Sequence, residues 1–268
     1  MCIILSCEPF ARPTTEEITA CWENNPDGAG LMYPEDNHVV ISKGYQTLKD
    51  FLTMVKCVPE SAPLVLHFRI GTAGGYGPEV THPFPVCRDL HTLHALDVEC
   101  PVGIAHNGVL PYAGDDKKAI SDTMEFIRTV CVPLDRDSRV RKEGGLVISP
   151  KAKKALSAKS AGSRLAIMDR FGDVRLVGKG WRSMRPGIEA SNGTYKPAYR
   201  YTTYALPSWH ADEAVELPAV ISEEVARFMA DNGCEACPNY ADCAASYPIC
   251  MEGMADLYGF APCDVARL

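Results

Sequence analysis

Hydrophobic and polar residues alternate in short runs over most of the chain. The runs are rich in β-branched residues and are bounded by turn-forming residues, a pattern that predicts β-strands. The predicted strands are Cys2–Ser6, Gly30–Tyr33, Val39–Ser42, Leu64–Ile70, Val102–His106, Arg164–Asp169 and Val174–Val177.

Helix signals are fewer than strand signals. The residues Thr14–Glu17 form a capping-box pattern, which predicts a helix that continues to about Asn24 and ends at the turn Asn25–Gly28. Because sheet segments outnumber helices, we expect an α+β fold with sheets covered by helices. The other predicted helices are Thr47–Cys57, Asp122–Val130, Pro150–Ala161 with its lysines facing solvent, and Ser222–Asp231.

A change of composition divides the chain. Residues 206–220 contain Pro207 and Pro218 and show little periodicity, so we interpret them as a linker. The linker separates a large domain over residues 2–205 from a small cysteine-rich segment over residues 221–268. The chain is therefore predicted to hold one large core and a small appendage.

Composition excludes several classes of protein. The formal net charge of −7 argues against a general nucleic-acid binder, and no apolar run of about 18 residues predicts a membrane span. The apolar run Ile3–Leu5 is too short for a signal peptide and has no basic region before it. The 12 cysteines among 268 residues lie below the density of a disulfide scaffold. We expect a protein of the reducing cytoplasm.

Cys2 is the first candidate for catalysis. Removal of Met1 would give Cys2 a free α-amine beside its thiol. An α-amine has a pKa of about 7.7 to 8.0 and a free thiol one of about 8.5, so both are near their reactive forms at neutral pH. The amine can then serve as the general base for the thiol. A small residue at position 2 is also common in proteins without such chemistry.

Four further segments follow Cys2 along the chain. They are Asn25–Gly30, His67–Gly74 with Thr81–Phe84, Ala105–Gly108 and Ser121–Thr123. Together with Cys2, in this order, they resemble the glutaminase domain of class II glutamine amidotransferases, an N-terminal-nucleophile hydrolase family with an αββα sandwich fold. The resemblance covers about residues 2–205, and Arg164–Asp169 and Gly187–Asn192 are similar to segments of small stand-alone members.

The resemblance implies a role for each candidate residue. Cys2 would be the nucleophile, and the Asn107 side-chain amide and the Gly108 N–H would stabilise the oxyanion. Arg69, in a pattern with Thr72, would bind the α-carboxylate of glutamine, and Asp122 would bind its α-ammonium.

Each of these roles has a structural alternative. Arg69 could pair with a structural acid, Asn107-Gly108 could be an ordinary tight turn, and Asp122 could cap a helix. We expect His106 to be structural, and His82-Pro83 to form a turn that supports the Arg69 loop.

Two residues depart from the family pattern. Many members have Trp where Ile70 stands and His where Ala73 stands. The substrate is therefore either glutamine or another γ-glutamyl or related amide, and an inactive binding or regulatory module is the third alternative. The amidohydrolase chemistry needs no cofactor. No second catalytic domain fits in the remaining residues, so we expect a separate synthase or ligase to accept the ammonia.

Cysteines concentrate near the end of the chain. The spacing Cys-x2-Cys-x5-Cys-x6-Cys supplies four thiolates, enough for a tetrahedral zinc site or an iron–sulfur cluster. Reduced core thiols and a disulfide pair are the alternatives. The four candidate ligands are Cys234, Cys237, Cys243 and Cys250, with Cys263 further on.

Overall fold

Two antiparallel β-sheets form the centre of the part of the chain that this computed structural model describes, residues 2–71, 77–115 and 120–196. The larger sheet has the strand order β10-β11-β1-β4-β2-β3-β6, and the smaller has the order β5-β7-β8-β9. The α+β class predicted from the sequence is confirmed. The strands are β1 (Ile3–Cys7), β2 (Ala29–Glu35), β3 (His38–Tyr45), β4 (Leu64–Phe68), β5 (Phe84–Pro85), β6 (Asp97–Cys100), β7 (Val102–Asn107), β8 (Arg164–Asp169), β9 (Val174–Val177), β10 (Arg182–Arg185) and β11 (Ile188–Ala190).

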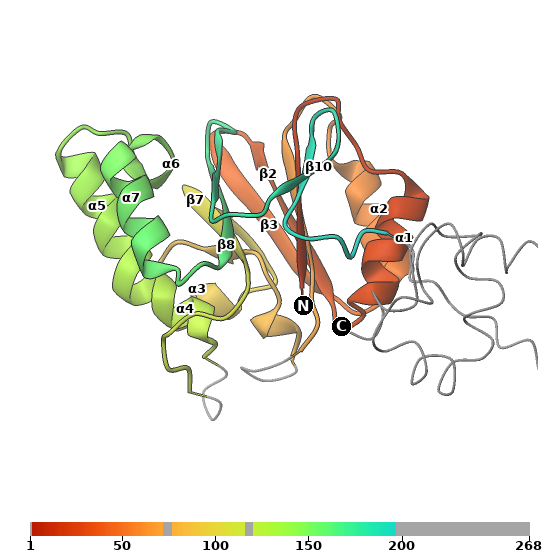
Figure 1. Ribbon diagram of the computed structural model, residues 1–268, viewed down its shortest axis with the longest axis horizontal. Helices are drawn as coiled ribbons and strands as arrows, with labels where there is room; N and C mark the ends of the chain where they lie inside the picture. The colour runs from red at the N-terminus through yellow and green to blue at the C-terminus, as the bar shows by residue number, and fades with distance from the viewer. Residues whose placement is uncertain (1, 72–76, 116–119, 197–268) are drawn as a thin grey trace, which may run out of the picture. The chain divides into compact units, whose positions relative to one another are not determined.

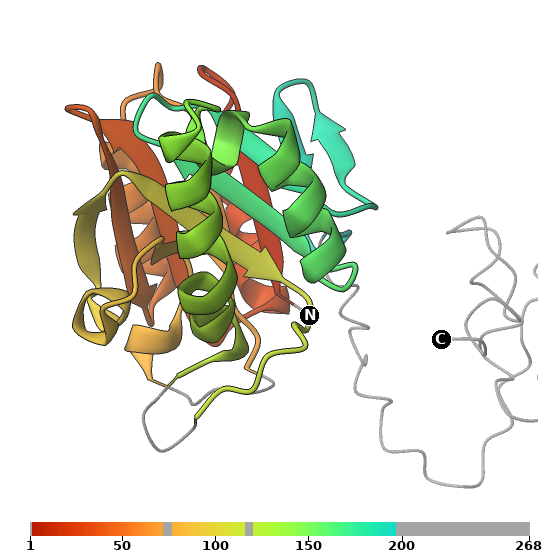
Figure 2. The same ribbon diagram turned by 90° about the vertical axis from the view of Figure 1, so that its left-hand side faces the viewer.

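Helices cover the outer face of each sheet (Figure 1). Helices α1 (Thr15–Asn24) and α2 (Leu48–Cys57) pack on the larger sheet. The helices of residues 122–159 pack on the smaller sheet, and Figure 2 shows them lying across it. They are α4 (Asp122–Phe126), the π-helical turn η3 (Ile127–Cys131), α5 (Val132–Val140), α6 (Gly145–Ile148) and α7 (Pro150–Lys159); the short α3 (Leu90–His94) and the 3-10 turn η1 (Pro78–Val80) connect strands.

A separate apolar core fills the space between the two sheets. Side chains of alternate positions in the larger sheet meet Ala105, Ala166 and Met168 of the smaller sheet. Burial of apolar surface on both faces of each sheet is the main stabilising contribution to this arrangement. The larger sheet contributes Ile4, Met32, Val39, Ile41 and Val65 to this core.

The alternation of side chains along a strand decides which residues face the space between the sheets. In β1, Ile3 and Leu5 face the helices and Ile4 faces the other sheet, so Cys2, two residues before Ile4, is on the same side as Ile4. In β7, Ala105 lies in the core between the sheets, and Asn107 follows it by two residues. Cys2 and Asn107 therefore face each other from different sheets.

All seven strands predicted from the sequence are present. The bounds of β8 and β9 match the prediction. β4 ends two residues earlier than predicted, and the other four strands shift or extend by one to three residues at an end. Four strands were missed. β5 has two residues and one of them is proline, β11 has three, and β6 and β10 are polar strands at the ends of the larger sheet, so none shows a clear alternating pattern.

Four of the predicted helix starts are confirmed. Thr14 caps α1 with the reciprocal hydrogen bonds of a capping box, Thr47 caps α2, and α4 and α7 begin at Asp122 and Pro150. The lysines of α7 are exposed, as predicted. The predicted end at Val130 is wrong, because the helical segment continues through η3 into α5. Pro133 lacks an N–H and would clash with a carbonyl of a regular helix, and the π-helical turn before it relieves this conflict.

The cysteine-rich segment and its linker, including the predicted helix Ser222–Asp231, lie outside the described residues. Among the residues that are described, no helix has both the length and the apolar character needed to cross a lipid bilayer.

Gly30 fixes how closely β2 approaches the segment that carries His82. A Cβ at this position would overlap the His82 carbonyl oxygen and lie 2.6 Å from Lys43 Cβ. We expect Gly30→Ala to lower the free energy of unfolding by about 1–3 kcal/mol because the core is overpacked. Urea denaturation measures this change. As the control, Gly193→Ala should stay within about 0.5 kcal/mol, because its nearest neighbour is Arg182 Nη1 at 3.6 Å. Equal effects of both substitutions would contradict the prediction.

Candidate active site

One small pocket contains four of the predicted site residues. Cys2, Arg69, Gly108 and Asp122 line a cavity of about 80 Å³. They come from four segments: the residue before β1, the residue after β4, the residue after β7 and the first turn of α4. Their approach is thus a product of the fold rather than of local sequence. The remaining lining residues are Ile70, Val80, His82, His106, Val109, Ser121 and Thr123.

The Cys2 thiol lies against the backbone of the Arg69 segment. Its Sγ is 3.4 Å from the Ile70 N–H and 3.5 Å from the Ile70 carbonyl oxygen, and the Cys2 carbonyl accepts a 2.7 Å hydrogen bond from Asn192 Nδ2. Burial raises the pKa of the Cys2 thiol, while the Ile70 hydrogen bond and the positive charge of Arg69 act in the opposite direction. The thiol is therefore protonated at neutral pH and needs a base to become a nucleophile.

The turn after α1 holds Arg69 in place. The Arg69 N–H donates to the Gly28 carbonyl at 2.8 Å, and the Asp27 N–H donates to the Arg69 carbonyl at 3.0 Å. The Asp27 carboxylate also accepts from the Gly71 N–H at 2.6 Å. Gly28 has φ +121°, a conformation that favours glycine, so the Asn-Pro-Asp-Gly sequence suits this support. Arg69 is buried, with 5% of its surface exposed, and it lines the pocket.

The predicted oxyanion pair lies at the end of β7. Gly108 lines the pocket with φ +138°, and a Cβ there would overlap Ser163 Oγ, so only glycine fits. Asn107 is 1% exposed, and the structure places its Nδ2 2.8 Å from Ser191 Oγ. Its Oδ1 is buried and has no hydrogen-bond partner within the described ranges. Asn107 thus lies just behind the pocket, held by the turn after β11.

Asp122 does not cap α4, so that alternative is wrong. Ser121 is the N-cap, and its Oγ accepts from the Met124 N–H at 3.2 Å. The Asp122 carboxylate instead accepts from the Leu110 N–H at 2.9 Å and from the Thr123 N–H at 2.7 Å. A carboxylate offers about four lone-pair sites, so acceptor capacity remains for a cation in the pocket.

A buried histidine cluster supports the pocket. Thr123 Oγ1 lies 2.8 Å from His106 Nδ1 and 3.2 Å from His82 Nε2, and His67 Nε2 is 3.1 Å from the His106 carbonyl oxygen. The His67 and His82 rings are 4.5 Å apart between centroids. Burial lowers the pKa of His67 to about 3 and that of His106 to about 4, where the nearby Asp122 charge acts in the opposite direction; burial also lowers the pKa of His82. All three imidazoles are therefore neutral at pH 7, which fits the structural role expected for His106.

Sequence reasoning gave no role to His67, Thr123, Ser191 or Asn192. Three of them carried a weak signal in the sequence. His67 is a polar residue inside the apolar strand Leu64–Phe68, and Ser191 and Asn192 directly follow a strand. Such positions are more informative than exposed polar residues, because a buried polar group needs a partner.

Several predicted residues lie outside the described residues, namely Thr72, Ala73, Cys234, Cys237, Cys243 and Cys250. Within the described part of the chain, no cluster of His, Cys, Asp or Glu side chains could hold a metal ion. The metal site thus stays a prediction. No protein-family model matches this chain, and no curated protein matches it at a significant level.

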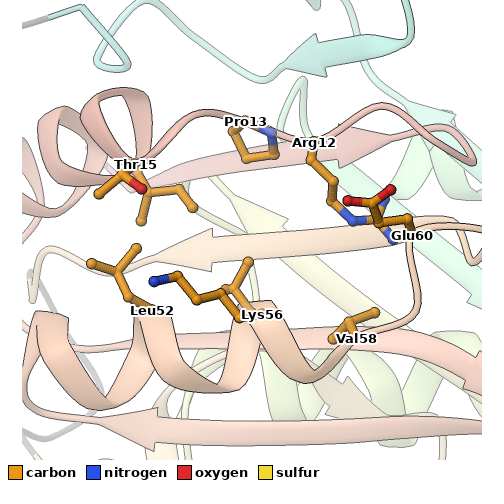
Figure 3. Close-up of a pocket in the computed structure, with 9 residues that line it drawn as sticks. Arg12, Pro13, Thr15, Leu52, Lys56, Val58 and Glu60 are labelled. Carbon is orange, nitrogen blue, oxygen red and sulfur yellow. The ribbon is translucent and has the colours of Figure 1, made fainter.

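A larger cavity between α1 and α2 is a weaker candidate for chemistry. It has a volume of about 210 Å³ and includes Arg12, Lys56 and Glu60 (Figure 3). The Arg12 guanidinium donates to the carbonyls of Pro59 and Ala62 at 2.6 and 2.7 Å, so these bonds fix its position. No cysteine, serine or histidine lines this cavity, so it offers fewer groups for nucleophilic chemistry than the Cys2 pocket does.

The histidine cluster predicts acid sensitivity. A folded-state pKa below the ordinary 6.5 means that the unfolded chain binds more protons as pH falls. Stability is therefore fully present above pH 6.5 and is lost as pH falls toward about 4, by up to about 1.4 kcal/mol per pH unit for each histidine. Urea denaturation at pH 7, 6 and 5 measures this slope.

Two single substitutions separate the cluster from other titrating groups. His67→Gln should reduce the slope by about one proton. His38→Gln is the matched control, because the His38 side chain is 49% exposed and lies outside the cluster. An unchanged slope in the His67 variant would contradict the assignment.

Proposed function

We propose that this chain hydrolyses the side-chain amide of glutamine as an N-terminal-nucleophile hydrolase with an αββα sandwich fold. The observation that carries the proposal is that Cys2, Arg69, Gly108 and Asp122 line one pocket. In this proposal, removal of Met1 leaves Cys2 with a free α-amine.

The amine solves the problem posed by the raised thiol pKa. With a pKa of about 7.7 to 8.0, a neutral α-amine takes the thiol proton as Sγ attacks the amide carbon. The same amine returns the proton to the departing nitrogen, which leaves as ammonia. Water then attacks the thioester, glutamate is released, and the thiol regains its proton. No histidine is required, in keeping with the neutral, buried state of the cluster.

Two charged side chains match the two charges of an amino acid. Arg69 would donate two parallel hydrogen bonds to the α-carboxylate, and Asp122 would accept a hydrogen bond from the α-ammonium. Both groups line the same cavity as Cys2. A substrate that lacks either charge would lose the corresponding charge-assisted hydrogen bonds, which disfavours binding.

The oxyanion of the tetrahedral intermediate needs donors at the end of β7. The Gly108 N–H and the Asn107 amide are the candidates, since Gly108 lines the pocket and Asn107 precedes it. Removal of one such donor typically lowers kcat about 10²- to 10³-fold.

A second candidate substrate is another γ-glutamyl or related amide. The observation that favours it is Ile70, which lines the pocket where many class II glutaminase domains carry Trp. With glutamine as substrate, the ammonia would pass to a separate synthase or ligase. In the remaining alternative, an inactive binding module, Cys2 would not react.

The first prediction concerns the nucleophile. Cys2→Ala should abolish glutamine hydrolysis, and an amino-acid diazo-ketone that mimics glutamine should add to Cys2 of the wild-type protein with Met1 absent. Intact mass and peptide mapping measure both the adduct and the processing. Cys57→Ala is the matched control, because Cys57 is an exposed free thiol. This variant should keep wild-type activity, and in the wild-type protein Cys57 should react with the diazo-ketone more slowly than Cys2. Undiminished hydrolysis by the Cys2 variant would contradict the proposal. If glutamine is not hydrolysed, a panel of γ-glutamyl amides distinguishes an enzyme with another amide substrate from an inactive binding module.

The second prediction concerns the head-group readout. Arg69→Gln should lower kcat/KM for glutamine about 10- to 100-fold through the loss of charge-assisted hydrogen bonds. A glutamine α-ester, which lacks the charged carboxylate, sharpens the test. Wild type should discriminate against the ester relative to glutamine, and the Arg69 variant should not. Arg128→Gln is the control, because Arg128 of η3 forms an ion pair with Glu125 of α4 and does not line the pocket. Retained discrimination in the Arg69 variant would contradict this role.

The third prediction concerns the C-terminal cysteines. We propose that Cys234, Cys237, Cys243 and Cys250 bind zinc or an iron–sulfur cluster. Metal analysis and an absorbance spectrum of anaerobically purified protein should give about one zinc or a cluster per chain, and Cys237→Ser should lower that content. Metal-free native protein would exclude the site.

A further inference from the structure

Ser191 joins the strand of the nucleophile to the end of β7. It follows β11, and its N–H donates to the Ile4 carbonyl at 2.9 Å. Its Oγ accepts from the Ile4 N–H at 2.9 Å and contacts the Asn107 amide at 2.8 Å. Ser191 is fully buried. One side chain thus touches both Asn107 and the residue two positions after Cys2.

The hydrogen bonds of Ser191 leave one proton unused. A hydroxyl has one donor and two acceptor sites. With Nδ2 of Asn107 pointing at Oγ, the hydroxyl accepts two hydrogen bonds and donates none, while Asn107 Oδ1 is buried without a partner in the described ranges. An unpaired buried acceptor is unfavourable, because it has lost its hydrogen bonds to water. Rotation of the amide by 180° exchanges its two ends, and the Ser191 hydroxyl can then donate to Oδ1.

We propose that Ser191 is a positioning residue that orients the Asn107 amide for catalysis. The Ser191 O–H donates to Asn107 Oδ1 and turns Nδ2 away, so that its N–H groups are offered to the oxyanion that forms from the substrate carbonyl. The Ile4 N–H makes this direction specific, because it occupies an acceptor site of Oγ and leaves the hydroxyl proton for Asn107. The proposal rests on the proposed amide hydrolysis for its catalytic consequence, but the orientation itself does not.

The next residue fixes the nucleophile in the same turn. Asn192 Nδ2 donates to the Cys2 carbonyl at 2.7 Å. The direction of this amide is settled, since Asn192 Oδ1 accepts from the Thr194 N–H at 2.9 Å and from its Oγ1 at 2.8 Å. Ser191 and Asn192 therefore tie the oxyanion donor and the nucleophile to one short segment, although the two belong to different sheets.

Kinetics test the catalytic consequence. Ser191→Ala should lower kcat about 10- to 100-fold with KM changed less than about threefold, because an oxyanion donor acts in the transition state. Ser191→Thr, which keeps the hydroxyl, should restore most of kcat. In the Asn107→Ala background, Ser191→Ala should cause no further loss, because it acts through Asn107. The control Ser138→Ala removes another buried hydroxyl, which bonds the Gly145 carbonyl, and should leave kcat unchanged.

Two kinetic results would overturn the proposal: a Ser191→Ala variant with wild-type kcat, or an equal loss in the Asn107→Ala background. The second result would mean that Ser191 contributes only to general structure.

Neutron diffraction from deuterated wild-type crystals tests the orientation without any variant. A Ser191 deuteron directed at Asn107 Oδ1 supports the proposal, and a deuterated Nδ2 directed at Ser191 Oγ overturns it. This measurement also separates the two proposals. A wild-type protein that hydrolyses no amide but shows the Ser191 deuteron on Oδ1 would contradict the proposed function and leave the orientation intact.

Discussion

The face-to-face packing of the two sheets determines the geometry of the candidate active site. Cys2 begins at one sheet and Asn107 ends a strand of the other, so the separation of the sheets sets the separation of these two groups. Gly103 of β7 allows a close approach, because a Cβ there would lie 2.7 Å from Met32 Sδ. The pocket lies at one end of the sheets, where hydrogen bonds rather than apolar contacts connect them. There, Ser191 bonds to Ile4 of the larger sheet and to Asn107 of the smaller sheet. The site thus lies where the apolar core ends.

Burying polar groups next to the pocket costs desolvation free energy, but their hydrogen bonds make the site rigid. For the three histidines, burial disfavours the charged form and therefore lowers the pKa. Lys43 adds a buried amine: burial lowers its pKa to about 7, and its Nζ donates to the carbonyls of Glu79 and Leu93. These bonds hold the segment that leads into His82, a wall of the pocket. A network whose members are mutually bonded fixes the lining residues better than apolar contacts alone.

The sequence predicted the parts of the fold that local patterns control. Alternation located the seven longer or more apolar strands, and the capping box at Thr14 located the start of α1, because both are short-range signals. Polar edge strands such as β6 and β10 were missed since their pairing comes from a neighbour rather than from their own composition. The π-helical turn before Pro133 was likewise beyond local rules. For the site, motif order indicated Cys2, Arg69, Gly108 and Asp122, whereas the role of Ser191 depends on contacts 187 and 84 residues away in sequence. Only the folded chain brings those partners together.

The state of the thiol links this architecture to chemistry. A cysteine with a lowered pKa is nucleophilic at all times and is readily oxidised, whereas a buried thiol with a raised pKa is inert until a base removes its proton. Cys2 is of the second kind, with its Sγ packed against the Ile70 backbone. In the proposed mechanism that base is part of the same residue, so activation requires no movement of a second side chain. What the surrounding fold must supply is then the position of the electrophile and of the oxyanion donors. In the proposal these tasks fall to three residues held in place: Arg69, whose backbone is bonded to the turn after α1, Gly108, which no other residue can replace, and Asn107, whose amide contacts the buried Ser191.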